Sequence, residues 1–325
     1  MTASGPAESP LQAVGTSDRA TEAFELLGNE TRLAILVALW ERYEPFEPPP
    51  AVRFSELRER VGTADSGQFN YHLDRLDGHF VTSTDAGYRL TDAGLKLVRS
   101  VIAGAGLETP EREPARVEAS CTLCGGPVEV RYADGWVHVR CTECEGLWPG
   151  ADDRPSGQLG QFALDPAGLT DRTPAEVYAA GWVRTFQHVH SMIEGVCPTC
   201  TGPVERELDV CADHEDDDGL CGRCGRRARV IARFRCSVCK DWARSTLGGV
   251  AKYHPRVVGF CYDRGLSLQY GANDLDHLTE LLSRASTTVE VLSTDPARVR
   301  VTTELDGDNV RLELDADLAV LDVEG

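Results

Sequence analysis

The chain has 325 residues, which favours two or three domains, and 42 % of them are hydrophobic, which is enough to build ordinary cores. No apolar run approaches eighteen residues, and the N-terminus has neither a basic nor an apolar segment. We therefore expect a cytoplasmic protein without a membrane span or a secretion signal. The formal net charge of −19, with only three lysines among the 33 basic residues, is typical of a halophilic protein, because molar salt screens repulsion between carboxylates beyond roughly 3 Å.

The sequence divides into six segments of different character. We expect a disordered N-terminus (1–16), a winged helix-turn-helix (17–103), a Gly/Pro/charge-rich linker (104–120), a zinc ribbon followed by a helix (121–195), a second zinc ribbon with an inserted zinc site (196–245), and a C-terminal region of helices and antiparallel sheet (246–325). The helix after the first zinc ribbon is expected near 174–193, because Thr173-Pro174-x-Glu176 is a capping pattern. The fold class is therefore α+β.

The first structured segment has the pattern of two short helices joined by a tight turn. Residues 29–43 form a core-facing helix by their apolar spacing, and residues 54–62 form a shorter one that ends at a glycine. Asp65 is placed to cap a further helix over 66–77, and about four residues that include a glycine join this helix to the preceding one. A two-stranded wing follows, turning at 85–87. Two helices with such a spacing predict a helix-turn-helix.

The second of these helices carries side chains suited to reading DNA. Glutamine and asparagine pair with adenine and arginine pairs with guanine in the major groove. The candidate contacts on this helix and on the wing are Gln68, Asn70, Tyr71, His72, Arg75 and Arg89. Tyr71 and His72 are equally compatible with packing. Residues 1–106 hold 10 basic and 15 acidic residues, which slightly favours the alternative of a protein-interaction module.

The N-terminal segment resembles a known family of regulators. The motifs ELLGNETRLAILVALW, FSELRERVG, DSGQFNYHLDRLDGHFV and DAGYRLTDAG are similar to those of ArsR-type winged helix-turn-helix regulators of the haloarchaeal kind, over about residues 20–103. The resemblance implies a homodimer on double-stranded DNA, with the 66–77 helix in the major groove of a pseudo-palindromic operator. The metal-sensing branch of that family has a Cys-x-Cys motif before the turn. FSELRERVG has no cysteine, so we do not expect metal sensing by that route.

Ten of the twelve cysteines fall into five Cys-x-x-Cys pairs, which in a cytoplasmic chain indicates metal binding rather than disulfides. Four have the spacing of a zinc ribbon: Cys121, Cys124, Cys141 and Cys144. Tetrahedral zinc is satisfied by four thiolates at about 2.3 Å, and two knuckles across a hairpin can present them. With no open position, such a site is structural.

A second, longer hairpin repeats the first, since CTLCGGPVEV at 121 matches CPTCTGPVER at 197. It offers eight candidate ligands for two further zinc ions: Cys197, Cys200, Cys211, His214, Cys221, Cys224, Cys236 and Cys239. In a nested arrangement, which the repeat favours, the outer two pairs bind one ion at the base and the inner two pairs bind another at the tip. In a sequential arrangement, the first two pairs bind one ion and the last two pairs the other. His214 is the weakest of the candidates.

Two features of the second half lie outside the zinc pattern. Cys261 is unpaired in an apolar stretch, where we expect it to be a buried core residue. Residues 221–244 carry seven arginines and one lysine against a single aspartate. This basic segment predicts either a second contact with nucleic acid or a partner for an acidic surface such as residues 215–218.

These patterns together predict a sequence-specific DNA-binding transcription regulator with three structural zinc ions. Its second half resembles the cysteine-rich domain, of unknown role, that accompanies this winged helix in haloarchaeal proteins, and could serve dimerisation, a small effector or the transcription machinery. A basal-factor-like role is an alternative, because a winged helix followed by a zinc ribbon also occurs in the archaeal homologue of the large TFIIE subunit. No catalytic constellation is found, so we do not expect an enzyme.

Overall fold

The computed structural model describes the chain except for residues 1–24, 105–109, 151–155, 216–218 and 269–274. The expected disordered segment 1–16 therefore lies outside the described residues. The chain forms two compact units, residues 1–107 and 108–325. The described part is a mixture of helices and four antiparallel sheets, which confirms the α+β class. No helix in it has the length and apolar character needed to cross a membrane.

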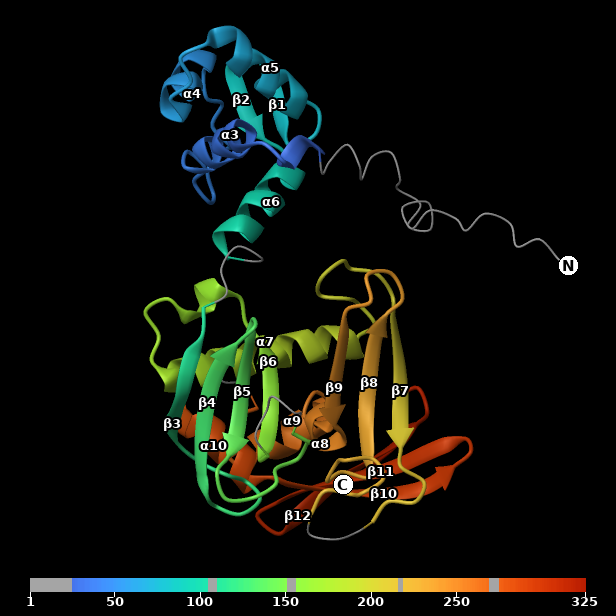
Figure 1. The fold of residues 1–325 in the computed structure, drawn as a ribbon. Helices are drawn as coiled ribbons and strands as arrows, with labels where there is room; N and C mark the ends of the chain where they lie inside the picture. Colours follow the sequence, from blue (N-terminus) through green and yellow to red (C-terminus); the bar gives the residue numbers. More distant parts are fainter. Residues whose placement is uncertain (1–24, 105–109, 151–155, 216–218, 269–274) are drawn as a thin grey trace, which may run out of the picture. The chain divides into compact units, whose positions relative to one another are not determined.

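In the described part of the first unit, helices α3 to α6 surround one hairpin (Figure 1). Its elements are α3 (Glu30–Trp40), α4 (Phe54–Val61), α5 (Ser66–Leu76), β1 (Val81–Thr84), β2 (Gly87–Leu90) and α6 (Asp92–Ile102). Gly62 ends α4 in the left-handed conformation, and the Asp65 carboxylate accepts the N–H groups of Gly67 and Gln68 at the start of α5. The apolar faces of α3, α4 and α5 meet in one core that includes Leu36 and Phe69.

The second unit begins with a four-stranded sheet in the order β3-β4-β5-β6. Its strands are β3 (Arg112–Ser120), β4 (Pro127–Ala133), β5 (Trp136–Cys141) and β6 (Gln158–Ala163). The prediction of a linker over 104–120 is wrong for 112–120, because this segment pairs with β4, for example Val117 with Val128. The small and apolar residues at alternate positions of β3 face inward, and its charged residues face solvent.

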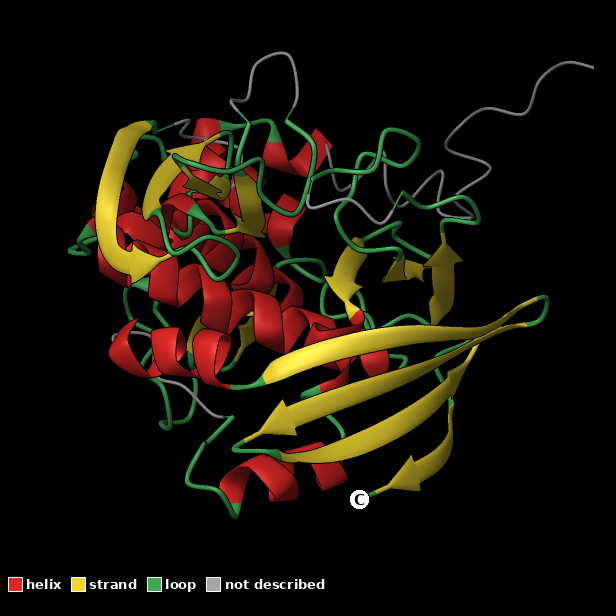
Figure 2. Ribbon diagram, turned by 90° about the horizontal axis from the view of Figure 1, so that it is seen from below, coloured by secondary structure: helices red, strands yellow, loops and turns green. Residues whose placement is uncertain are grey.

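The rest of the unit contains a three-stranded sheet, β7 (Val204–Val210), β8 (Val230–Cys236) and β9 (Trp242–Thr246), and a C-terminal four-stranded meander (Figure 2). The meander is β10 (Ser286–Thr294), β11 (Ala297–Leu305), β12 (Asp308–Asp315) and β13 (Val320–Glu324). The helical elements are η1 (Pro166–Leu169), α7 (Pro174–Ile193), α8 (Leu247–Ala251), α9 (Pro255–Tyr262) and α10 (Leu275–Arg284). The expected C-terminal region of helices and antiparallel sheet is thus present.

Helix α7 joins the two cysteine-bearing sheets (Figure 1). Thr173 and Glu176 form a capping box at its start, so the helix begins where the sequence predicts. Val177 and Tyr178, near its N-terminus, belong to the core of the first sheet. Met192, near its C-terminus, belongs to the core shared by the three-stranded sheet and the meander. The two sheets therefore share one helix as a common support.

Candidate metal centres and the cavity between the sheets

The first metal centre lies at one end of β4 and β5. Its four sulfur atoms all lie within 4.8 Å of one another. The Sγ atoms of Cys121 and Cys144 are 3.8 Å apart, and those of Cys124 and Cys141 are 3.5 Å apart. Four sulfurs at 2.3 Å from a tetrahedral ion would be separated by about 3.8 Å. The predicted ligands therefore fit one metal ion with all four positions filled.

The second hairpin brings its outer two cysteine pairs together in the same way. The Sγ atoms of Cys197 and Cys239 are 3.6 Å apart, and those of Cys200 and Cys236 are 3.5 Å apart. These pairs form one group that can hold a metal ion, and the inner pairs form another. The nested arrangement is therefore confirmed, and the sequential arrangement is excluded.

The third group stands at the tip of the second hairpin and contains Cys211, His214, Cys221 and Cys224. The Nδ1 atom of His214 lies 3.5 Å from Cys224 Sγ and faces the group. Its Nε2 atom lies 3.2 Å from the carbonyl oxygen of Arg227. A carbonyl in this position fixes the ring and leaves Nδ1 as the ligand atom. The weakest of the predicted ligands thus has the surroundings of a metal ligand.

Four of the cysteine pairs share one backbone geometry. The N–H of the first cysteine donates to the carbonyl five residues later, and the residue after the second cysteine donates back to the carbonyl of the first. These residues are Gly125, Thr201, Gly225 and Lys240, and each has a positive φ. Further backbone N–H groups donate to sulfur, as Val238 does to Cys236 Sγ at 3.4 Å. The local backbone therefore shapes each pair as a knuckle around its sulfurs.

These N–H groups also favour thiolates. Backbone donation, first from Cys239, lowers the pKa of Cys236 to about 6. Backbone donation, first from Glu215, lowers the pKa of Cys221 to about 6. Desolvation raises the pKa of Cys211 to about 11. The group at the tip thus contains Cys221, whose thiolate is favoured, beside Cys211, whose thiol is favoured.

The predicted DNA contacts come mainly from α5. Gln68, Asn70, Tyr71 and Arg75 are exposed on this helix, and Arg89 is exposed on β2. The Asn70 amide donates to Asp74 at 2.8 Å, one turn along the helix. Four polar or aromatic side chains of α5 are therefore available to a partner on the face opposite the core.

His72 does not lie with them. Its side chain is only 7 % exposed, and its helical position places it on the core face between Phe69 and Leu76. Desolvation, with a smaller contribution from Arg32, lowers the pKa of His72 and favours the neutral ring. The prediction of a DNA contact is wrong for His72, which is a packing residue.

The arginine-rich segment 221–244 has internal partners. Arg226 and Arg233 both form ion pairs with Asp209 on β7. Arg227 Nε donates to the Gly146 carbonyl at 3.1 Å, beyond the first metal centre. The arginines of β8 and of the loop before it therefore stabilise the tip of the second hairpin. Neither of the two predicted roles, a contact with nucleic acid or a partner for an acidic surface, included these contacts. Of the acidic residues 215–218, the last three lie outside the described residues.

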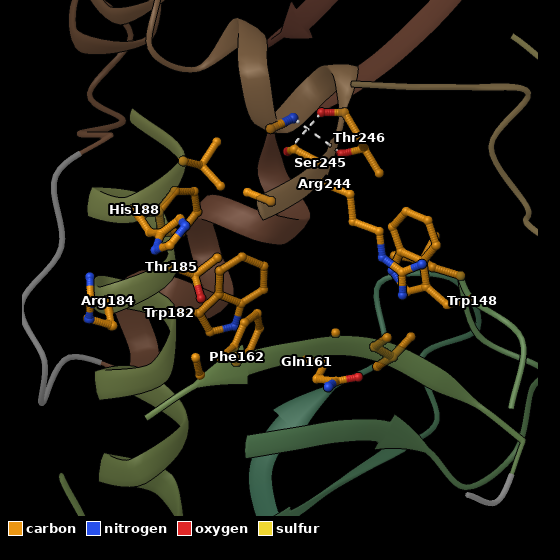
Figure 3. Close-up of a pocket in the computed structure, with 18 of the residues that line it drawn as sticks. Trp148, Gln161, Phe162, Trp182, Arg184, Thr185, His188, Arg244, Ser245 and Thr246 are labelled. Atoms are coloured by element: carbon orange, nitrogen blue, oxygen red, sulfur yellow. Dashed lines mark hydrogen bonds between the residues drawn. The ribbon is translucent and has the colours of Figure 1, made fainter. Parts of the chain in front are cut away.

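A cavity of about 500 Å³ lies between the two cysteine-bearing sheets and α7 (Figure 3). Four of the chain's five tryptophans line it: Trp136, Trp148, Trp182 and Trp242. No sequence pattern indicates this cavity, because its walls come from segments that are separated along the chain. The available signal was the confinement of these tryptophans to the two hairpins and the helix that joins them.

Comparisons with known proteins identify families without a described activity. A family model named DUF7347, a domain of unknown function, matches residues 20–101. A second model, DUF7351, also a domain of unknown function, matches residues 118–320. No curated protein and no solved structure matches the chain. Because the second match covers more than half of its length, and includes all three metal centres and the cavity, the chain belongs to the DUF7351 family.

Proposed function

We propose that the protein is a sequence-specific, DNA-binding transcription regulator with a winged helix-turn-helix in its first unit and structural zinc in its second. The observation that carries the proposal is the exposed face of α5, which presents Gln68, Asn70 and Arg75 while the opposite face is buried. These side chains have the donors and acceptors that read base edges in the major groove.

The surroundings of α5 support this interpretation. Helix α4 ends at Val61 and α5 begins at Ser66, so four residues separate the two helices, as in a helix-turn-helix. The β1–β2 hairpin follows α5 and carries the exposed Arg89, as a wing would. The resemblance of this segment to ArsR-type regulators implies that a homodimer binds a pseudo-palindromic operator.

We assign zinc to the three metal centres on the chemistry of their ligands. Two centres offer four sulfurs and the third offers three sulfurs and one imidazole nitrogen. Soft ligands in a tetrahedral set of four select zinc, and a filled set leaves no position for a substrate. Elemental analysis of protein purified without added metal should give three zinc ions per chain. Three ions of another metal, or fewer than three, would contradict the assignment.

Fluorescence anisotropy tests the DNA-binding proposal. We expect the zinc-loaded protein in molar KCl to prefer a fragment of its own upstream DNA over a scrambled fragment. The variant Gln68→Ala/Arg75→Ala should lose at least tenfold of that preference, since each base contact contributes roughly 1–3 kcal/mol. The matched control Gln187→Ala/Arg300→Ala removes the same residue types from exposed or half-exposed positions of the second unit and should bind normally.

Two outcomes would contradict the proposal. Equal binding to both fragments, or no binding at all, would exclude a sequence-specific regulator and favour an interaction module or a basal-factor-like role. An unchanged preference in the α5 variant would assign the reading of DNA to another part of the chain.

A further inference from the structure

We propose that the cavity between the two cysteine-bearing sheets binds a planar aromatic anion with the chemistry of an aryl carboxylate. This inference goes beyond the proposed function and does not depend on DNA binding. The cavity volume, about 500 Å³, is within the range of roughly 300–1,000 Å³ found for small-molecule sites.

The walls of the cavity are suited to a flat ring. On the side of the first sheet and α7, the ring of Trp182 lies 4.7 Å from Phe162 and is stacked 5.0 Å from Phe186. Trp136 of β5 and Trp242 of β9 also line the cavity, and their rings have centroids 6.4 Å apart and an interplanar angle of 30°. Aromatic side chains therefore come from both sheets and from the helix that joins them. A planar aromatic ligand would find stacked or edge contacts on more than one side.

The charges of the residues that line the cavity indicate whether its ligand is an anion or a cation. Among the described residues that line the cavity, Arg184, Arg244 and Lys252 are cationic, whereas Asp241 is the only carboxylate. Its Oδ2 atom accepts the Thr199 hydroxyl at 2.7 Å beside the second metal centre and lies 3.6 Å from His188 Nε2. Three cations against one carboxylate favour an anionic ligand, although the net charge of the whole chain is −19.

The position of Arg244 indicates where the anionic group would bind. Its guanidinium carbon lies 4.3 Å from the centroid of the Trp148 ring, so the indole holds the flat face of the guanidinium. A guanidinium binds a carboxylate through a planar, bidentate contact along its edge. Figure 3 shows Arg244 and Trp148 on the side of the cavity opposite Thr185 and His188 of α7. A carboxylate at Arg244 would therefore direct its aromatic ring toward Trp182.

Isothermal titration calorimetry of the full-length, zinc-loaded protein in molar KCl tests this inference, with 2-naphthoate as the probe. Octanoate has the same charge without a ring, and 2-naphthylmethanol has the ring without a charge. We expect 2-naphthoate to bind at least tenfold more tightly than either. Equal binding of octanoate would overturn the aromatic part of the proposal, and equal binding of the alcohol would overturn the anionic part.

Three variants locate the probe. Arg244→Gln should weaken 2-naphthoate binding at least tenfold, whereas Arg300→Gln, which removes an arginine from β11 outside the cavity, should not change it. Trp242→Ala removes one aromatic wall at a side chain that is 55 % exposed, so it should fold normally and still weaken binding several-fold. Absence of binding by the unmodified protein, or unchanged binding in both cavity variants, would overturn the proposal.

Discussion

The two cysteine hairpins of the second unit start from the same plan and close in different ways. In the first, two residues, Asp134 and Gly135, connect β4 to β5, and both have a positive φ. In the second, residues 211–229 connect β7 to β8 and hold the third metal centre. The strands pair in the same register, since Val128 pairs with Cys141 in one hairpin and Val204 pairs with Cys236 in the other. The first knuckles of the two hairpins also share one backbone geometry.

This difference shows two physical solutions to the same problem. A two-residue turn with both positions left-handed matches the twist of its strands and needs only backbone freedom. A long connection has no such local solution, and the ends of β7 and β8 must be held by cross-links through the metal and the arginines. The first hairpin should therefore be sensitive to its turn residues and the second to its ligands.

The largest effect is expected from a ligand at the base of the second hairpin. Cys236→Ser should release one of three zinc ions and abolish the cooperative melting of the second unit, because the free energy of structural zinc binding in small domains is about 10–16 kcal/mol and is coupled to folding. Elemental analysis and circular dichroism melts measure both effects. The neighbouring exposed Ser237→Ala should retain three ions. A Cys236→Ser variant with three ions, or an unchanged melt, would contradict this role of the base centre.

A ligand at the tip should have a smaller and more local effect. His214→Ala should leave two zinc ions and lower the free energy of unfolding by roughly 3 kcal/mol, the contribution of a cross-link that closes a loop of about fifteen residues. Leu220 donates its N–H to Glu145 at 3.2 Å, and Trp148 follows on the same loop. The variant should therefore also weaken 2-naphthoate binding in the cavity.

The control for this prediction is His190→Ala. His190 is exposed on α7, where its Nε2 atom lies 3.8 Å from Glu194, and it is not a member of the three metal centres. It should retain three zinc ions and bind the probe normally. If His214→Ala also retains three ions, a group other than the imidazole is the fourth ligand of the tip centre. The second hairpin would then not depend on His214 to close its long connection.

The next smaller loss of stability is expected from a substitution in the turn of the first hairpin. Gly135 has φ 78° with no atom within 4 Å of an added Cβ, so Gly135→Ala tests conformation without a steric clash. An L-residue in this region costs roughly 1–2 kcal/mol, and urea denaturation should show that loss. Gly259→Ala is the control, because this glycine in α9 has an ordinary φ and open space, and alanine there should be neutral or stabilising. Equal stability of the two variants would show that the turn does not limit the hairpin.

The features that the sequence predicted are those fixed by local chemistry. The capping box at Thr173 and Glu176 gave the start of α7, and the repeated knuckles gave the nested pairing of the metal ligands. Strand β3 was taken for a linker because charged residues occupy its exposed positions and only small or apolar side chains mark its inner face. His72 was assigned to the wrong face because residue type, rather than helical position, decided the assignment.

The cavity could not be predicted for a different reason. Its walls are formed where β6, α7 and β9 pack together, and no segment of the chain contains more than a part of it. Likewise, the partner of Arg226 is Asp209, seventeen residues away on another strand. The cavity depends on how the two hairpins are placed by α7, and the ion pair depends on how the long connection between β7 and β8 folds back onto β7. No local pattern specifies either.

The knuckles offer the finest comparison of the two hairpins. The position after the second cysteine has a positive φ in each, but it is Gly125 in the first hairpin and Thr201 at the base of the second. A β-branched residue is strained there, whereas the Thr201 hydroxyl donates to the Cys200 carbonyl at 2.6 Å and offsets part of the strain. We expect Thr201→Gly to stabilise the protein by up to about 1 kcal/mol, and Gly125→Thr to destabilise it, in matched urea titrations. If Thr201→Gly is destabilising instead, the hydroxyl contributes more than backbone freedom, and the second hairpin is held by side-chain contacts even where the first relies on glycine.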